Sequence, residues 1–187
     1  MLEPGLLLMP SAVNTYDEAL STTLKNEGGV DKNSVLGSGV SNFGVTQRAW
    51  DAYAKSKGIP TKPVTQLRPS EVTTFYREEY YDKPKLGLLP PEIAKQVFDF
   101  GVNAGPSVAI KKLQEVIGAV PDGLIGNETT QKVVSSDESK TINSYLDSRL
   151  SFYESLAKEK PQHYAKFLDG WRARVDTQRQ GVRKNAR

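Results

Sequence analysis

The 187-residue chain has no cysteine and a single histidine, His163. The absence of cysteine excludes disulfides, thiol nucleophiles and thiolate metal ligands, and one histidine leaves a zinc ion with almost only oxygen ligands. Serine-histidine and cysteine-histidine catalysis are therefore disfavoured, and we predict no metal and no cofactor. Carboxylates remain for hydrolytic chemistry, and they need no metal when the bond to be broken is an acetal.

Long apolar runs are also missing. Residues 6–9 are apolar, but four residues are far too few to span a bilayer, and Glu3 stands where a signal peptide would carry Lys or Arg. We expect no membrane span and no signal peptide, so that action outside the producing cell would need another route of release.

The excess of one charge is small, because 25 Lys and Arg residues face 22 Asp and Glu residues for a net charge of +3. This composition does not indicate a specific nucleic-acid partner. Hydrophobic residues make up 37% of the chain, which is enough for a real core. We expect one compact domain and a monomer.

Apolar residues recur at helical spacing along most of the chain, which predicts a mainly α fold. Residues 28–44 are the exception, since they are rich in glycine and serine and favour turns or a small β-hairpin. We expect a tail over 1–13, a lobe over 14–89 and a helical half over 90–187. Helices are predicted over 16–25, 46–57, 70–83 with Ser70 as its cap, 90–102, 106–117, 127–134 with Asn127 as its cap, 137–158 and 161–179.

Glu27 ends the first predicted helix and stands directly before Gly28 and Gly29. The negative end of the helix dipole and any apolar wall would disfavour its carboxylate, which raises the pKa and leaves a protonated acid near neutral pH. A glycosidase needs such an acid to protonate the leaving oxygen. Alternatively, Glu27 is a solvated residue near a helix end that the two glycines simply stop.

Three blocks of the sequence resemble glycoside hydrolase family 108, the phage-type muramidases or endolysins. The first joins Asn26-Glu27-Gly28-Gly29 to residues 39–47. The second runs from Val97 through Asn103 to Pro106 and on to Thr129, and it is similar to the predicted peptidoglycan-binding region that accompanies the family. The third, residues 170–175, is similar to a closing Gly-Trp-x-x-Arg-Val.

The resemblance implies a lysozyme-like helical fold and hydrolysis of the β-1,4 bond between N-acetylmuramic acid and N-acetylglucosamine in bacterial peptidoglycan. It matches Glu27 to the catalytic acid and places Ser41 and Phe43 where the family has threonine and tyrosine. Leu36 falls where family members commonly carry an aspartate. Water positioning or substrate binding is therefore expected from the remaining polar and aromatic candidates, which are Asp31, Ser41, Phe43, Thr46, Gln47 and Asn103.

The missing aspartate leaves the mechanism open. Ser41 or Thr46 could position a water for an inverting hydrolysis. Glu27 could instead act as acid and then base while the muramic 6-hydroxyl attacks, which is the lytic transglycosylase reaction. A third alternative is a noncatalytic peptidoglycan-binding or virion structural protein.

The resemblance also implies a biological setting. We expect the protein in the host cytoplasm until a holin releases it to the periplasm and cell wall, or on the virion. The active cleft is expected between the glycine-rich lobe and the helices from Glu92 onward, where Asn103 would reach the glycan. Tyr80 and Tyr81 are predicted as an exposed aromatic pair for stacking on sugar rings. The basic residues after Arg172 fit nonspecific attraction to the anionic wall or a solvated helix end.

Overall fold

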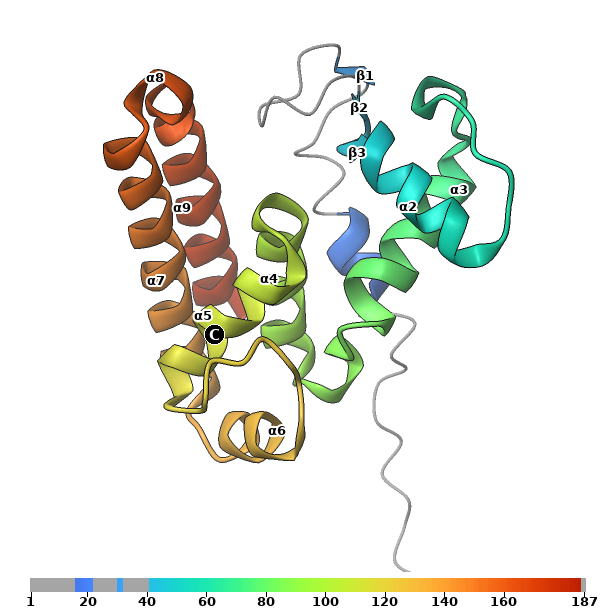
Figure 1. Ribbon diagram of the computed structural model, residues 1–187. Coiled ribbons are helices and arrows are strands. Elements are labelled where there is room, and N and C mark those ends of the chain that lie inside the picture. Colours follow the sequence, from blue (N-terminus) through green and yellow to red (C-terminus); the bar gives the residue numbers. More distant parts are fainter. Residues whose placement is uncertain (1–15, 22–29, 32–40, 186–187) are drawn as a thin grey trace, which may run out of the picture. The chain divides into compact units, whose positions relative to one another are not determined.

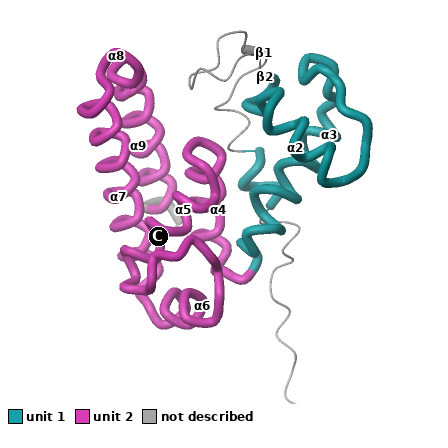
Figure 2. Tube along the Cα trace, viewed as in Figure 1, with its two compact units in different colours: residues 1–87 teal, residues 88–187 magenta. Residues whose placement is uncertain are grey.

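The computed structural model describes residues 16–21, 30–31 and 41–185 of the chain. These residues are mostly helical (Figure 1), which confirms the predicted mainly α fold. The chain divides into two compact units, residues 1–87 and residues 88–187 (Figure 2). The second unit begins two residues before the predicted C-terminal half at residue 90. Within the described ranges, no helix is both long and apolar enough to cross a membrane.

Unit 1 contains a small antiparallel sheet in the glycine-rich segment. The sheet consists of β1 (Val30–Asp31), β2 (Ser41–Asn42) and β3 (Val45–Thr46), in the order β1-β2-β3. The hairpin predicted for this segment is confirmed, because β2 and β3 pair directly across the two residues between them.

Helix α2 (Gln47–Lys57) follows β3 without a linker. The Thr46 hydroxyl accepts a hydrogen bond from the Ala49 backbone N–H at 3.2 Å and so caps the helix. At the other end Gly58 takes a φ of 64°, the left-handed conformation that ends helices and suits glycine. The predicted helix over 46–57 is thereby confirmed.

A 3₁₀ turn, η1 (Val64–Gln66), leads into α3 (Pro69–Tyr76), whose cap differs from the prediction. Arg68, not Ser70, is the N-cap residue, because Pro69 fits the first helical position and the Glu71 carboxylate accepts the Arg68 backbone N–H at 2.8 Å. The helix then widens into a π-helical turn, η2 (Arg77–Asp82), and a second 3₁₀ turn, η3 (Leu86–Leu88), follows it.

Aromatic side chains form much of the core of unit 1 and contact one another through ring edges. The Tyr16 ring, on the short helix over 16–21, lies 5.4 Å from that of Tyr81, which is only 2% exposed. Tyr80 is half-buried against Phe75 at 5.7 Å and Tyr76 at 5.3 Å. The predicted exposed pair, Tyr80 and Tyr81, is therefore wrong: both rings belong to this packing.

Unit 2 is built from helices packed side by side. They are α4 (Pro91–Ala104), α5 (Pro106–Ile117), α6 (Asn127–Val134), α7 (Glu138–Glu159), α8 (Pro161–Tyr164), the 3₁₀ turn η4 (Ala165–Phe167) and α9 (Leu168–Asn185). Helix α4 packs on α5, and α7 packs on both α5 and α9 (Figure 1).

Two details of unit 2 differ from the sequence prediction. Asn127 is the first residue of α6 and the cap is Gly126. The single helix predicted over 161–179 is interrupted by η4. Apolar spacing of three residues suits a 3₁₀ turn as well as an α-helix, so the pattern alone did not reveal the interruption.

Candidate functional site

Glu27 and Leu36, the residues on which the predicted chemistry depends most, lie outside the described residues. The sheet that follows Glu27 is described, and its register brings three predicted site residues into one row. Asp31 pairs with Ser41, and Ser41 pairs with Thr46. Directly paired residues are neighbours across antiparallel strands. The backbone therefore places Asp31, Ser41 and Thr46 side by side, as a site built on this hairpin would require.

The turn between β2 and β3 has an unusual backbone conformation. Its two central residues, Phe43 and Gly44, have φ angles of 48° and 77°, and positive φ at both positions is the mark of a type I′ hairpin turn. Glycine adopts this conformation without cost, whereas it is strained for phenylalanine. The Tyr76 hydroxyl donates a hydrogen bond to the Phe43 carbonyl at 2.7 Å and ties the turn to α3.

Asn42 anchors the same hairpin from its other side. Its side chain is 4% exposed and donates from Nδ2 to the Val64 carbonyl at 3.0 Å. Sequence reasoning did not single out Asn42, although it lies inside the block that carries the family resemblance. No local pattern indicated its role, because the carbonyls that its Nδ2 reaches lie 22 and 25 residues further along the chain.

The Gln47 side chain is engaged in the local structure. Its Nε2 donates to Asp51 Oδ1 at 2.9 Å and to the Lys62 carbonyl at 3.0 Å, and its Oε1 accepts the Val64 backbone N–H at 2.9 Å. These bonds hold the loop after α2 against the start of that helix. A role of Gln47 or Thr46 in substrate binding stays a prediction.

Asn103 belongs to a buried polar network inside unit 2. Its Oδ1 accepts hydrogen bonds from Arg149 Nη2 at 3.1 Å and from the Tyr153 hydroxyl at 3.0 Å. Arg149 also pairs with Asp99 at 2.7 Å, and Asp99 accepts from Arg174 Nη2 at 2.6 Å. Asp99, Asn103 and Arg174 come from the second and third blocks of the resemblance, so those blocks meet in this network. Contact of Asn103 with glycan is untested.

Sequence reasoning missed this network, although the sequence contains a signal for it. Asp99 stands within the apolar run 97–102, and Arg149 lies between buried positions of α7. A charge on a buried helix face needs an opposite charge. Two such charges of opposite sign on different helices predict an ion pair.

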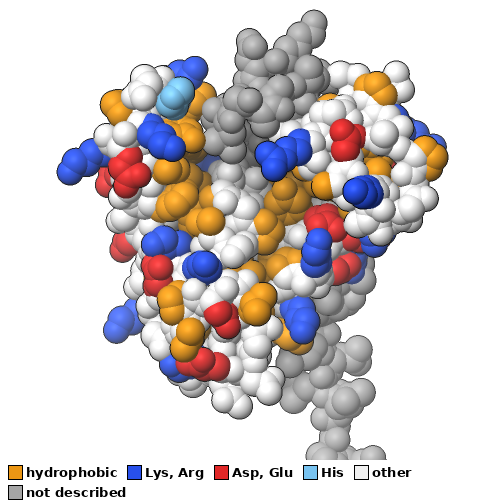
Figure 3. Space-filling view, in the orientation of Figure 1, with side chains coloured by type: hydrophobic (Ala, Val, Ile, Leu, Met, Phe, Trp, Pro, Cys, Tyr) orange, Lys and Arg blue, Asp and Glu red, His pale blue; other side chains and the backbone are white. Residues whose placement is uncertain are grey.

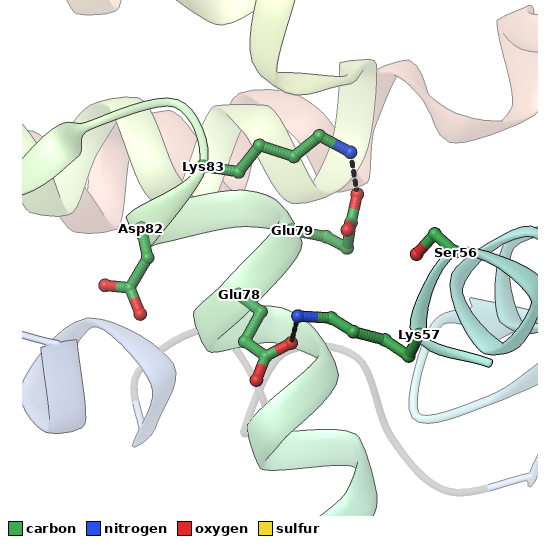
Figure 4. Close-up of a pocket in the computed structure, with 6 residues that line it drawn as sticks. All are labelled: Ser56, Lys57, Glu78, Glu79, Asp82 and Lys83. Carbon is green, nitrogen blue, oxygen red and sulfur yellow. Dashed lines mark hydrogen bonds and ion pairs between the residues drawn. The ribbon is translucent and has the colours of Figure 1, made fainter. Parts of the chain in front are cut away.

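An open groove of about 510 Å³ lies in unit 1 between the end of α2 and η2 (Figure 4). Its lining is charged, and the charges are paired: Lys57 Nζ lies 2.5 Å from Glu78 Oε2 and Lys83 Nζ lies 2.6 Å from Glu79 Oε2. The remaining lining residues are Ser56 and Asp82. The Lys57 ammonium lowers the pKa of Glu78, so this carboxyl is deprotonated and unsuited to act as an acid near neutral pH.

The other carboxyl groups with a shifted pKa in the described part of the chain also have a lowered pKa, as Glu78 does. Hydrogen bonds from Lys62 and Arg68 lower the pKa of Glu71 to about 2. Burial alone would raise the pKa of Asp99, but Arg149 and Arg174 lower it overall. Side-chain hydrogen bonds also lower the pKa of Asp51 and Asp122. A general acid needs the opposite shift.

A metal site is not formed by the described residues, among which no three Asp, Glu or His side chains gather closely enough to hold an ion.

Comparison with known proteins matches two successive parts of the chain, and the first match extends from unit 1 into unit 2. Residues 20–105 match the family described as glycosyl hydrolase 108, and residues 108–176 match the family described as Predicted Peptidoglycan domain. The solved structure of Brucella abortus SagA is similar, with 28% identity, a TM-score of 0.78, and coverage of 91% of this chain and 94% of the SagA chain. No curated protein matches the chain.

The fold and the first match support a glycoside hydrolase, and the second match supports peptidoglycan as the partner. The predicted lysozyme-like fold class is confirmed by the structural similarity. Residues 20–105 are similar to the glycosyl hydrolase 108 family, as the sequence blocks indicated.

Proposed function

We propose that the protein is a muramidase that hydrolyses the β-1,4 bond between N-acetylmuramic acid and N-acetylglucosamine, with Glu27 as the general acid. The match of residues 20–105 to glycosyl hydrolase 108 carries this proposal, since that region includes Glu27. The pKa values of other carboxyl groups also support the proposal. Those of Glu71, Glu78 and Asp99 are all lowered, so these groups are poor candidates for the general acid.

In the proposed reaction, the Glu27 carboxyl transfers its proton to the bridging oxygen as the bond from that oxygen to the muramic C1 breaks. A water molecule attacks C1 and loses a proton, leaving a reducing muramic end. The row formed by Asp31, Ser41 and Thr46 supports binding of this water near the sheet, because the row lies on the strands that follow Glu27 in the sequence. Leu36 stands where the family has an aspartate. Apart from Glu27, Asp31 is the carboxylate nearest to Leu36 in the sequence, and it could accept the proton of the attacking water.

The peptidoglycan match of residues 108–176 supports binding of the wall polymer by unit 2. Together with the family resemblance it favours a phage endolysin or a virion-associated enzyme as the setting. Cleavage would then weaken the wall of a bacterial host.

One observation favours a second candidate reaction. Leu36 removes the second carboxylate, and a lytic transglycosylase needs only one, because the muramic 6-hydroxyl replaces water as the nucleophile. Glu27 would protonate the bridging oxygen and then accept the proton of that hydroxyl. The product is an anhydro sugar and no water is consumed.

Mass spectrometry of the muropeptides released from purified peptidoglycan separates the two reactions. We expect reducing-end products from hydrolysis. Anhydro products, lighter by one water, would assign the transglycosylase reaction instead. If the protein binds the wall and releases no muropeptide, the remaining alternative is a noncatalytic binding or virion structural protein.

A further inference from the structure

Three aromatic side chains gather at one end of unit 2, where α7 ends and α8, η4 and the start of α9 follow. Tyr164, Phe167 and Trp171, which we call the aromatic tip, are each partly exposed. The Trp171 ring lies 6.2 Å from that of Tyr164 and 5.9 Å from that of Phe167. On the face shown in Figure 3, hydrophobic side chains gather over this end of unit 2 among Lys and Arg side chains.

Trp171 packs against the core of unit 2 through one buried aromatic residue. Its ring stacks on that of Tyr153, with 4.5 Å between centroids and 17° between planes, and Tyr153 is only 2% exposed. The Tyr153 hydroxyl is fixed in turn by Arg149 and Asn103, at 3.0 Å in each case. The buried network therefore orients Trp171, which is an aromatic surface prepared before any ligand binds.

Positive charge surrounds the aromatic tip. The Lys166 ammonium lies 4.9 Å from the Phe167 ring centroid, and Lys158 and Lys160 are exposed on the same end. Two carboxylates there are already paired, because Arg172 binds Glu154 at 2.9 Å and Asp169 at 3.7 Å. Glu159 is exposed as well and offsets part of the charge.

We infer that the aromatic tip is a glycan-binding surface for the intact peptidoglycan strand. Rigid, partly exposed rings offer apolar faces for the C–H faces of sugar rings, and the lysines offer counter-charges for the carboxylates of the stem peptides. This inference rests on the proposed function for its ligand, and it lies within residues 108–176, whose family description names peptidoglycan without naming residues. The tip acts in binding the polymer and takes no part in breaking the bond.

Co-sedimentation of the full chain with purified sacculi tests the inference. In a Glu27→Gln background, which keeps the polymer intact, we expect Tyr164→Ser with Phe167→Ser to weaken binding about tenfold. The changes avoid Trp171, whose removal would uncover Tyr153. Val134→Ser, on a side chain that is 68% exposed elsewhere in unit 2, is the matched control and is expected to bind normally. The unfolding midpoints of the variants must agree, so that weaker binding does not reflect unfolding. If they differ, the binding assay is repeated with Trp171→Phe, which keeps an aromatic ring stacked on Tyr153.

The charge contribution is tested by changing Lys158, Lys160 and Lys166 together to Gln, with Lys140→Gln as control. We expect the triple change to weaken binding to whole sacculi and to leave binding to chitin oligosaccharides, which carry no carboxylate, unaltered. Loss of binding to vesicles of anionic lipid, with binding to sacculi retained, would overturn the inference and assign the surface to membranes.

Cleavage by chains that keep Glu27 separates this inference from the proposed function. We expect the tip variants to cleave soluble muropeptide fragments like the wild type and to lose activity on sacculi. Normal binding of sacculi by the tip variants, with a cleaving wild type, overturns the inference and leaves the function standing. Weakened binding by these variants, with a wild type that cleaves nothing, overturns the function and supports the inference.

Discussion

The Asp99 carboxylate and the Arg149 guanidinium form an ion pair, 2.7 Å long, in which the side chains are only 4% and 0% exposed. The pair joins α4 to α7, and Arg174 brings in α9 through two hydrogen bonds to the same carboxylate, at 2.6 and 3.1 Å. Charges this deep are tolerated only when they are paired and hydrogen-bonded. The fold of unit 2 therefore depends on Asp99 more than on any surface ion pair.

We expect Asp99→Asn to destabilise the protein by about 3–5 kcal/mol, because it leaves the buried Arg149 and the partly buried Arg174 without their counter-charge. Urea denaturation followed by circular dichroism measures the change. Asp169→Asn is the control, since that carboxylate is 99% exposed and 3.7 Å from its partner. A loss for Asp99→Asn no larger than that of the control would show that the pair does not stabilise unit 2.

The pH dependence of stability follows from the same carboxylate. Its pKa is lowered in the folded state, so its contribution is fully present above the unfolded pKa of about 3.9 and is lost as the pH falls toward the folded value. Glu71, with a folded pKa of about 2, acts in the same direction. We expect the stability difference between wild type and Asp99→Asn to shrink when urea denaturation is repeated below pH 4. A difference that is constant with pH would contradict the assignment.

The hairpin turn offers a test of backbone strain at Phe43. Both Phe43→Ala and Phe43→Asn remove the ring, but only asparagine tolerates a φ of 48° well. We expect the asparagine variant to be more stable than the alanine variant by about 1 kcal/mol. Thermal unfolding of the two variants measures the difference. Equal stabilities would mean that the turn relaxes when the ring is removed.

Gln114 is expected to be a second stability determinant in unit 2. Its side chain is 1% exposed, accepts the Gly123 backbone N–H at 2.8 Å and donates to Asp122 Oδ1 and the Leu124 carbonyl at 2.8 and 2.9 Å. Gln114→Ala leaves these groups unpaired and should cost about 1–3 kcal/mol in urea denaturation. The exposed Gln131→Ala is the control, and similar losses in both variants would refute the role of Gln114.

The sequence predicted those features of the fold that depend on local patterns. Apolar spacing located α2, α4, α5 and α7, and glycine enrichment located the hairpin. The cap of α3 was missed because a carboxylate three residues on, Glu71, binds the backbone of Arg68 from within the helix. The exposure of Tyr80 and Tyr81 was mispredicted because the π-helical turn changes which side chains face the core.

For the candidate site, spacing could place residues on the hairpin but could not give their register. The row formed by Asp31, Ser41 and Thr46 depends on strand pairing, which a one-residue shift would change. The partners of Asn103 come from positions 46 and 50 residues further along the chain, and no local pattern specifies such contacts.

The most direct test of the central claim is the release of muropeptides from purified peptidoglycan by the wild type and by Glu27→Gln. Glu78→Gln is the matched control, because Glu78 lies in the charged groove and its pKa is lowered. The account predicts that the wild type and Glu78→Gln release muropeptides and that Glu27→Gln is slower by at least about 100-fold while still binding the wall. Release by Glu27→Gln at the wild-type rate would contradict it.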